Sequence, residues 1–210
     1  MTYPNSGSGL RGWTLFLLMS LLVLLFATTT MLLHTELVEA LRSAIRVTAR
    51  TSFALFLLTF LASSLVTLVP TNGTKALLRE RRFLGLAFAF SHLVHGILIL
   101  TYAQLFPETF WAGRTPAANI PGSTGYLFIL LLTITSFPVM VRLLGFRTWK
   151  WLHSTGTWVI AAIFCLSFYK RLPLHPWYLI GFSIMVSAIV LKLTAKTAIR
   201  ARKSSQAGVL

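Results

Sequence analysis

Three histidines lie within long apolar segments of this 210-residue chain. His92 and His95 are three residues apart, so a helix would place them on adjoining parts of one face. His153 lies near the start of a later apolar segment. If these segments span a membrane, an ionisable side chain inside them is costly to bury and by default indicates a functional site. The three imidazoles are therefore the main candidates for chemistry in this sequence.

The residues around these histidines favour a bulky planar cofactor over a bare metal ion. Small residues at helical spacing leave room for a macrocycle, although they also suit plain helix–helix packing. The chain has only 4 Asp and Glu residues and 1 cysteine, which argues against zinc, di-iron and Cys-cluster sites. Neutral imidazoles suit haem iron, and Arg82, Arg147 and Lys150 are candidates to pair with haem propionates. The small residues are Gly85, Ala89, Gly96, Gly156, Thr157 and Ala161.

The composition places the chain in lipid. Hydrophobic residues make up 56% of it and charged residues only 11%, with a mean hydropathy of +0.77. A soluble domain carries about a quarter charged residues, and a disordered chain has low hydrophobicity, so both classes are excluded. The net charge of +15 would suggest a nucleic-acid partner in a soluble protein. Because the basic residues lie between the apolar segments, we expect them to orient the chain in a bilayer instead.

The apolar segments predict an all-α membrane bundle of six transmembrane helices that forms a single domain over residues 1–210. Each segment meets or approaches the length of about 20 residues that a spanning helix needs. Lys and Arg are concentrated on the side that holds both chain ends, so both termini are expected in the cytoplasm. The expected helices cover residues 13–33, 51–69, 83–106, 122–141, 151–169 and 177–193.

Two connecting segments carry expectations of their own. Pro107–Pro121 is rich in Pro, Gly and Asn and is expected to form a non-helical lid on the outer side. Thr35–Arg50 has charges at helical spacing and is expected to form a short surface helix. His34 and His175 lie at the outer ends of helices and are interpreted as ordinary boundary residues.

Two stretches of the sequence resemble ferric-reductase-like transmembrane domains. The first, Arg81-Arg82-Phe83-Leu84-Gly85-Leu86 with His95, is similar to the RR-x-LGL…H entry to the third helix of that family. The second, Thr135-Ser136, Arg142, Leu144-Gly145, Trp149 and Leu152-His153, is similar to the TS…R-x-LG…W-x-x-LH segment that enters the fifth helix. Within the family, the chain looks most like the haem-binding membrane subunit of the bacterial methionine-sulfoxide reductase system.

The resemblance implies one or two haem b groups, with His95 and His153 as iron ligands and His92 as an additional candidate. The family has a second histidine further along the fifth helix, where this chain reads Phe164-Cys165-Leu166-Ser167. His95 and His153 are expected about 20 Å and 5 Å along their helices from the inner boundary. The two histidines are therefore not obviously at the same depth in the membrane. Three alternatives follow: another residue pairs with His95, the haem is five-coordinate, or haem has been lost.

The resulting hypothesis is a haem-binding subunit that transfers electrons across the bilayer to an acceptor on the outer side. The sequence shows no dinucleotide motif and no soluble domain, so no flavin or nicotinamide site is expected in this chain. A separate flavoprotein or a quinol would then donate the electrons, and the chain would not be a complete enzyme. Two alternatives stay open: a small transporter with a histidine proton relay, and a cofactor-free structural protein. A bacterial inner membrane is the expected location.

Overall fold

The computed structural model describes residues 11–112 and 115–207. The described chain is helical throughout and contains no strand, and six of its helices are long and apolar enough to cross a membrane. These observations confirm the expected class of fold. Five of these helices are α1 (Trp13–Leu32), α2 (Leu37–Leu68), α3 (Asn72–Leu105), α7 (Phe146–Tyr169) and α8 (Tyr178–Ala207). The sixth span, Pro116–Ile134, consists of a 3-10 turn followed by α5 (Ile120–Ile134).

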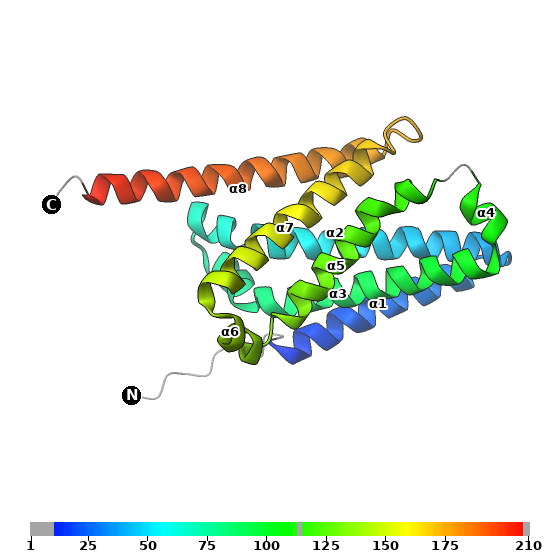
Figure 1. Ribbon diagram of the computed structural model, residues 1–210, viewed down its shortest axis with the longest axis horizontal. Coiled ribbons are helices and arrows are strands. Elements are labelled where there is room, and N and C mark those ends of the chain that lie inside the picture. Colours follow the sequence, from blue (N-terminus) through cyan, green and yellow to red (C-terminus); the bar gives the residue numbers. More distant parts are fainter. Residues whose placement is uncertain (1–10, 113–114, 208–210) are drawn as a thin grey trace.

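The helices run back and forth along one axis (Figure 1). Helix α2 packs against α1, α3 and α8, while α7 packs against α5 and α8. The start of α1 and the end of α8 lie toward the same end of the bundle, and α4 (Pro107–Trp111) lies at the opposite end. This arrangement agrees with chain ends on one side of the membrane, and the assignment of that side to the cytoplasm stays a prediction.

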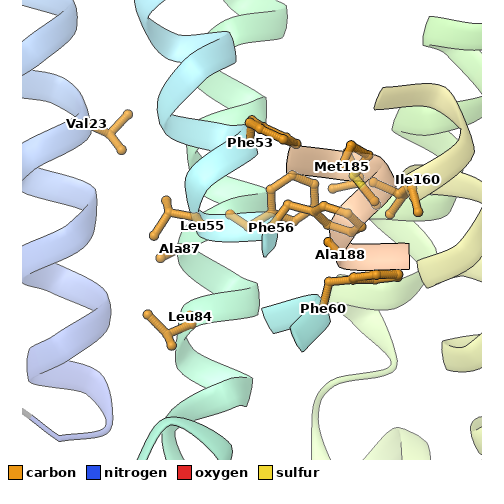
Figure 2. Close-up of a cluster of buried hydrophobic side chains, with 13 residues drawn as sticks. Val23, Phe53, Leu55, Phe56, Phe60, Leu84, Ala87, Ile160, Met185 and Ala188 are labelled. Carbon is orange, nitrogen blue, oxygen red and sulfur yellow. The ribbon is translucent and has the colours of Figure 1, made fainter. Parts of the chain in front are cut away.

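Aromatic side chains fill the centre of the bundle (Figure 2). Phe56 and Phe60 of α2 are 3% and 0% exposed, and they pack with Ile160 of α7 and Met185 of α8. Many leucines on the outer faces of the helices are exposed, for example Leu17 and Leu21 of α1. A lipid environment accounts for such an apolar exterior, because lipid chains cover apolar surface that water would not.

The expectation of a separate surface helix over Thr35–Arg50 was wrong, because α2 runs without a break from Leu37 to Leu68. No Pro or Gly occurs within this range to end a helix. Its charged side chains also find partners on their own face. Arg42 donates to Glu39 at 3.0 Å and to the Tyr102 hydroxyl at 3.0 Å, which ties this part of α2 to α3. Polar residues therefore extend the helix past the expected apolar segment.

The expectation of a non-helical lid over Pro107–Pro121 was also wrong for the described residues. Helix α4 begins at Pro107, and a 3-10 helix, η1, spans Pro116–Asn119. Proline suits the first position of a helix because its missing N–H would have no partner there. Phe110 is buried, with its ring centroid 6.0 Å from that of Tyr102, so α4 is held against α3. Arg114 lies outside the described residues.

Other helix boundaries differ from those expected. Helix α3 begins at Asn72, where Thr71 and Thr74 form a reciprocal capping box, and α7 begins at Phe146 after Gly145. Helix α5 ends at Ile134 because Phe137 is extended before a proline, and a short helix, α6 (Pro138–Leu144), follows. Helix α8 continues beyond residue 193 to Ala207. At the starts of α3 and α7, a capping box and a glycine mark boundaries that hydropathy alone leaves open.

Candidate functional site

The ring of His95 is held in a defined orientation by α2. Its Nδ1 atom lies 3.1 Å from the carbonyl oxygen of Ile45 and 3.1 Å from the hydroxyl oxygen of Thr48. A carbonyl oxygen only accepts hydrogen bonds, so this contact requires a proton on Nδ1. The other ring nitrogen, Nε2, then carries the free lone pair. A metal-binding histidine is commonly fixed in this way, with one N–H on a carbonyl and the other nitrogen available as a ligand.

A row of hydroxyl groups joins α2 to α3 next to His95. The Thr48 hydroxyl is fully buried and donates to the carbonyl of Ala44 at 2.8 Å, which leaves its oxygen free to accept from His95. About one turn earlier on α3, the Ser91 hydroxyl lies 2.8 Å from that of Ser52 and 3.2 Å from that of Thr51. Hydrogen bonds of this kind hold membrane helices together, so they fix the register that places His95 opposite Ile45.

His92 lies beside His95 in a pocket of aromatic rings. The two imidazole centroids are 5.2 Å apart, and the ring centroids of Phe88, Tyr126 and Phe164 lie 5.6, 4.8 and 6.3 Å from that of His92. The Nδ1 atom of His92 is buried and has no hydrogen-bond partner among the described residues. Buried polar atoms are nearly always paired, so an unpaired imidazole nitrogen marks a place where a ligand or a water is expected.

These residues fit a haem held by one histidine. His95 offers a neutral imidazole with a free Nε2, the flat rings of Phe88 and Phe164 suit a planar group, and His92 has an unsatisfied nitrogen. Phe164 of α7 lies beside His92, with the two ring centroids 6.3 Å apart. Among the described residues, no group of three or more His, Cys, Asp or Glu side chains is arranged to hold a bare metal ion.

The structure does not bring His153 to the other two histidines. Its Nε2 atom lies 2.9 Å from the Thr135 hydroxyl, which also lies 2.7 Å from the carbonyl of Leu131. A hydroxyl has one proton, so if Thr135 donates it to the Leu131 carbonyl, the Nε2–H of His153 donates to the Thr135 oxygen. His153 precedes Phe164 by eleven residues on α7, which is about 16 Å along the helix. Because Phe164 contacts His92, His153 lies at a different depth in the bundle from His92 and His95, as expected from the sequence. The role of His153 as an iron ligand stays a prediction.

The two arginines predicted to bind propionates also lie away from His92 and His95. The guanidinium of Arg82 lies 5.5 Å from each of the ring centroids of Phe83 and Phe137, and its Nε is buried without a hydrogen bond among the described residues. Arg147 is exposed near the start of α7. Arg82 precedes His92 by ten residues, about 15 Å along α3. Their pairing with a cofactor stays a prediction.

A cavity of about 370 Å³ lies among α2, α3, α7 and α8, and its mostly apolar walls carry several cationic and hydroxyl side chains that sequence reasoning did not bring together. Arg81 lies before the expected helix over residues 83–106 and Lys192 at the end of the one over 177–193, but both lie well inside long helices, α3 and α8, and line this cavity. Arg81 is the tenth residue of α3, which begins directly after the capping box at Thr71. A prediction that continued the helix through its polar first turns would have placed Arg81 inside it. The cavity is lined by Ser63, Arg81, Phe146, Trp149, Lys150, His153, Ser154, Thr157, Trp158 and Lys192.

Comparison with known proteins gives one match. The model of a protein family described as ferric reductase like transmembrane component matches residues 48–165. This range contains Thr48, His92, His95 and His153, together with the stretches that suggested the resemblance. No curated protein and no solved structure matches the chain. The particular likeness to a methionine-sulfoxide reductase subunit therefore stays a prediction.

Proposed function

Because the chain belongs to the family of ferric reductase like transmembrane components, we propose that it binds haem b inside the membrane and carries electrons across the bilayer. The family and the six membrane-crossing helices indicate transmembrane electron transfer. The observation that carries the haem proposal is the contact between His95 Nδ1 and the Ile45 carbonyl, because it leaves Nε2 ready to bind iron.

The residues of the chain have separate tasks in this proposal. Haem supplies a one-electron carrier whose potential depends on its axial ligand, its burial and nearby charge. His95 would hold the haem iron through Nε2, and the Ile45 carbonyl and Thr48 hydroxyl orient its ring and raise its basicity. Phe88, Phe164 and the other rings of the core keep water from the site. His92 is a second imidazole next to His95, and its Nδ1 would be able to hold a water or a polar group of the bound cofactor.

We infer that separate molecules supply and remove the electrons. A flavoprotein or a quinol would donate at the end of the bundle where the chain termini lie, since basic residues are concentrated there and attract acidic partners. The acceptor would bind at the opposite end, near α4. We place the protein in a bacterial inner membrane. In this proposal the chain is the electron-transfer subunit of an oxidoreductase and depends on its partners for a complete reaction.

Visible spectroscopy of the purified protein tests the haem proposal. Protein expressed with an adequate haem supply is expected to show a sharp Soret band when oxidised and an alpha band after reduction with dithionite. A His95→Ala variant is expected to lose or reshape both bands. His175→Ala is the matched control, because His175 is exposed and lies outside the helices. A colourless wild-type protein that is folded would overturn the proposal, as would an unchanged spectrum of His95→Ala.

The same spectra decide the role of His153. If it binds iron, His153→Ala reshapes the spectrum. If His153 only forms the hydrogen bond to Thr135, the His153→Ala variant keeps the wild-type spectrum and its temperature of unfolding falls. A Thr135→Val variant removes the same hydrogen bond and leaves the imidazole in place. A spectrum that changes in His153→Ala and stays unchanged in Thr135→Val therefore identifies His153 as a ligand.

A further inference from the structure

The cavity beside His153 is lined by two cations that are anchored to neighbouring carbonyl groups of α2. Arg81 of α3 donates its Nε–H to the carbonyl of Thr59 at 3.0 Å. Lys192 of α8 donates to the carbonyl of Phe60 at 2.7 Å, and its ammonium lies 4.2 Å from the centre of the Phe60 ring. Each anchor uses only part of the donor capacity of its side chain. The terminal nitrogens of Arg81 and the remaining N–H groups of Lys192 are therefore available to the cavity.

No carboxylate side chain of the protein neutralises this pair. All 4 acidic residues lie within the described part of the chain. Glu80 accepts from Arg79 and from the backbone N–H of Gly12, and Glu39 pairs with Arg42. Glu36 and Glu108 lie at the opposite ends of α2 and α3, before Leu37 and after Leu105. Unpaired charges within a membrane protein are costly and are normally matched by a partner. An anion from outside the chain is the missing partner.

The walls of the cavity indicate what kind of anion this is. Ser63, Ser154 and Thr157 supply hydroxyl groups, and Lys150 adds a third cation at the rim. Trp149 and Trp158 also line the cavity, and tryptophan is concentrated where lipid headgroups meet the hydrocarbon. Basic pockets between membrane helices on the cytoplasmic side bind the headgroups of anionic lipids. A phosphate group offers several acceptor oxygens to the donors of Arg81 and Lys192.

We propose that this cavity binds the headgroup phosphate of an anionic phospholipid between α3, α7 and α8. The cavity lies away from the haem proposed at His95, because Arg81 precedes His95 by 14 residues, about 21 Å along α3. His153 lines the cavity, so a lipid in it and a role of His153 as an iron ligand are alternatives. The bound lipid links three helices that are distant in sequence. It also neutralises the positive charge next to His153 and Thr135, at the junction of α5, α6 and α7.

Native mass spectrometry of the detergent-solubilised protein tests this proposal. Titration with dioleoylphosphatidylglycerol is expected to give a saturable one-to-one complex, while dioleoylphosphatidylcholine, which has no net charge, binds at least tenfold more weakly. A variant with both Arg81→Met and Lys192→Met is expected to lose this preference. The matched control carries Lys75→Met and Lys196→Met, since these exposed cations lie on the same helices, α3 and α8, but outside the cavity.

Two results would overturn the proposal. One is equal binding of the two lipids to the wild-type protein, which needs no variant and so holds even if the double variant fails to fold. The other is displacement of phosphatidylglycerol by inorganic phosphate at similar concentration, because the cavity would then serve a soluble phosphorylated molecule. The visible spectrum is recorded on the same samples. A colourless protein that still prefers phosphatidylglycerol would contradict the haem proposal and leave the lipid site intact.

Discussion

His92 and His95 lie with their ring centroids 5.2 Å apart on α3, yet only His95 has a hydrogen-bond partner for its Nδ1 atom among the described residues. Two like side chains one helical turn apart therefore have different chemistry. The Ile45 carbonyl fixes the proton of His95 on Nδ1, while nothing in the described structure fixes that of His92. The first is prepared to be a ligand through Nε2, and the second has an unsatisfied nitrogen that a bound group can use.

Replacing Thr48 with valine tests whether its hydrogen bond to His95 Nδ1 tunes the imidazole as an iron ligand. Thr48→Val removes one acceptor of the His95 N–H but keeps the Ile45 carbonyl, so the proton stays on Nδ1 and haem is retained. A weaker hydrogen bond at Nδ1 makes the imidazole a poorer donor to iron, and we expect the reduction potential to rise. A spectroelectrochemical titration measures it. Thr51→Val is the control because Thr51 contacts Ser91 and not His95. A potential equal in both variants would contradict this role of Thr48.

The unpaired Nδ1 of His92 makes a separate prediction about stability. His92→Phe removes a buried polar atom that has no partner, so the cofactor-free protein is expected to gain about 1–3 kcal/mol in free energy of unfolding. Denaturant titration of protein purified after haem-depleted growth measures this. The exposed His175→Phe serves as the control and is expected to change stability by less than about 0.5 kcal/mol. A loss of stability in His92→Phe would show that its nitrogen is paired after all.

The contact between α3 and α5 depends on the absence of a side chain at Gly96. A Cβ atom there would lie 2.8 Å from the Tyr126 hydroxyl oxygen and 3.0 Å from two of its ring carbons. Gly96→Ala is therefore expected to displace Tyr126 from His92, whose carbonyl it contacts at 3.3 Å, and to cost about 1–3 kcal/mol. Thermal unfolding measures the cost.

Two further variants make this test specific. Adding Tyr126→Phe removes the closest clashing atom, so the double variant is expected to recover part of the loss. Gly122→Ala places a methyl group where nothing lies within 4 Å, and it should be neutral or stabilising by up to about 1 kcal/mol. If Gly96→Ala and Gly122→Ala behave alike, close packing at Gly96 is not what holds Tyr126.

Hydropathy predicted the six spans because each segment between charged residues is long enough to cross a bilayer. It could not predict that α2 begins at Leu37, since that depends on Arg42 finding Glu39 and Tyr102 once the helices pack. It placed Arg81 in a loop for the same reason. A charged residue ends an apolar segment in the sequence but does not end a helix that has carbonyl groups available as partners.

The candidate site was predicted in part. The three-residue spacing brings His92 and His95 together, because a helix places such positions side by side. The difference between them could not be read from the sequence, since Ile45 is 50 residues from His95 and contributes a backbone carbonyl, which every residue possesses. The hydroxyl of Thr135 beside His153 lay within a stretch already singled out, but its contact depends on where α5 ends.

The start of α1 is fixed by a carboxylate of α3. One oxygen of Glu80 accepts from the backbone N–H of Gly12 at 2.8 Å, and the other accepts from Arg79 at 2.9 Å. Gly12 has a positive φ of 61°, so the turn before α1 needs both glycine and this acceptor. Glu80→Ala leaves the N–H without its charged partner and is expected to cost about 1.5 kcal/mol.

Hydrogen exchange over residues 11–16 locates this effect, because detachment of the α1 start exposes its first amides while α5 and α7 stay protected. Glu80→Gln keeps an oxygen acceptor and is expected to cost less. The control is Glu39→Ala, which removes an exposed ion pair with Arg42 and is expected to cost under about 1 kcal/mol. Equal exchange at residues 11–16 in the Glu80→Ala and Glu39→Ala variants would mean that Glu80 does not anchor α1. A selective increase in Glu80→Ala would show that the sole buried acid of the described chain holds the first helix to the bundle.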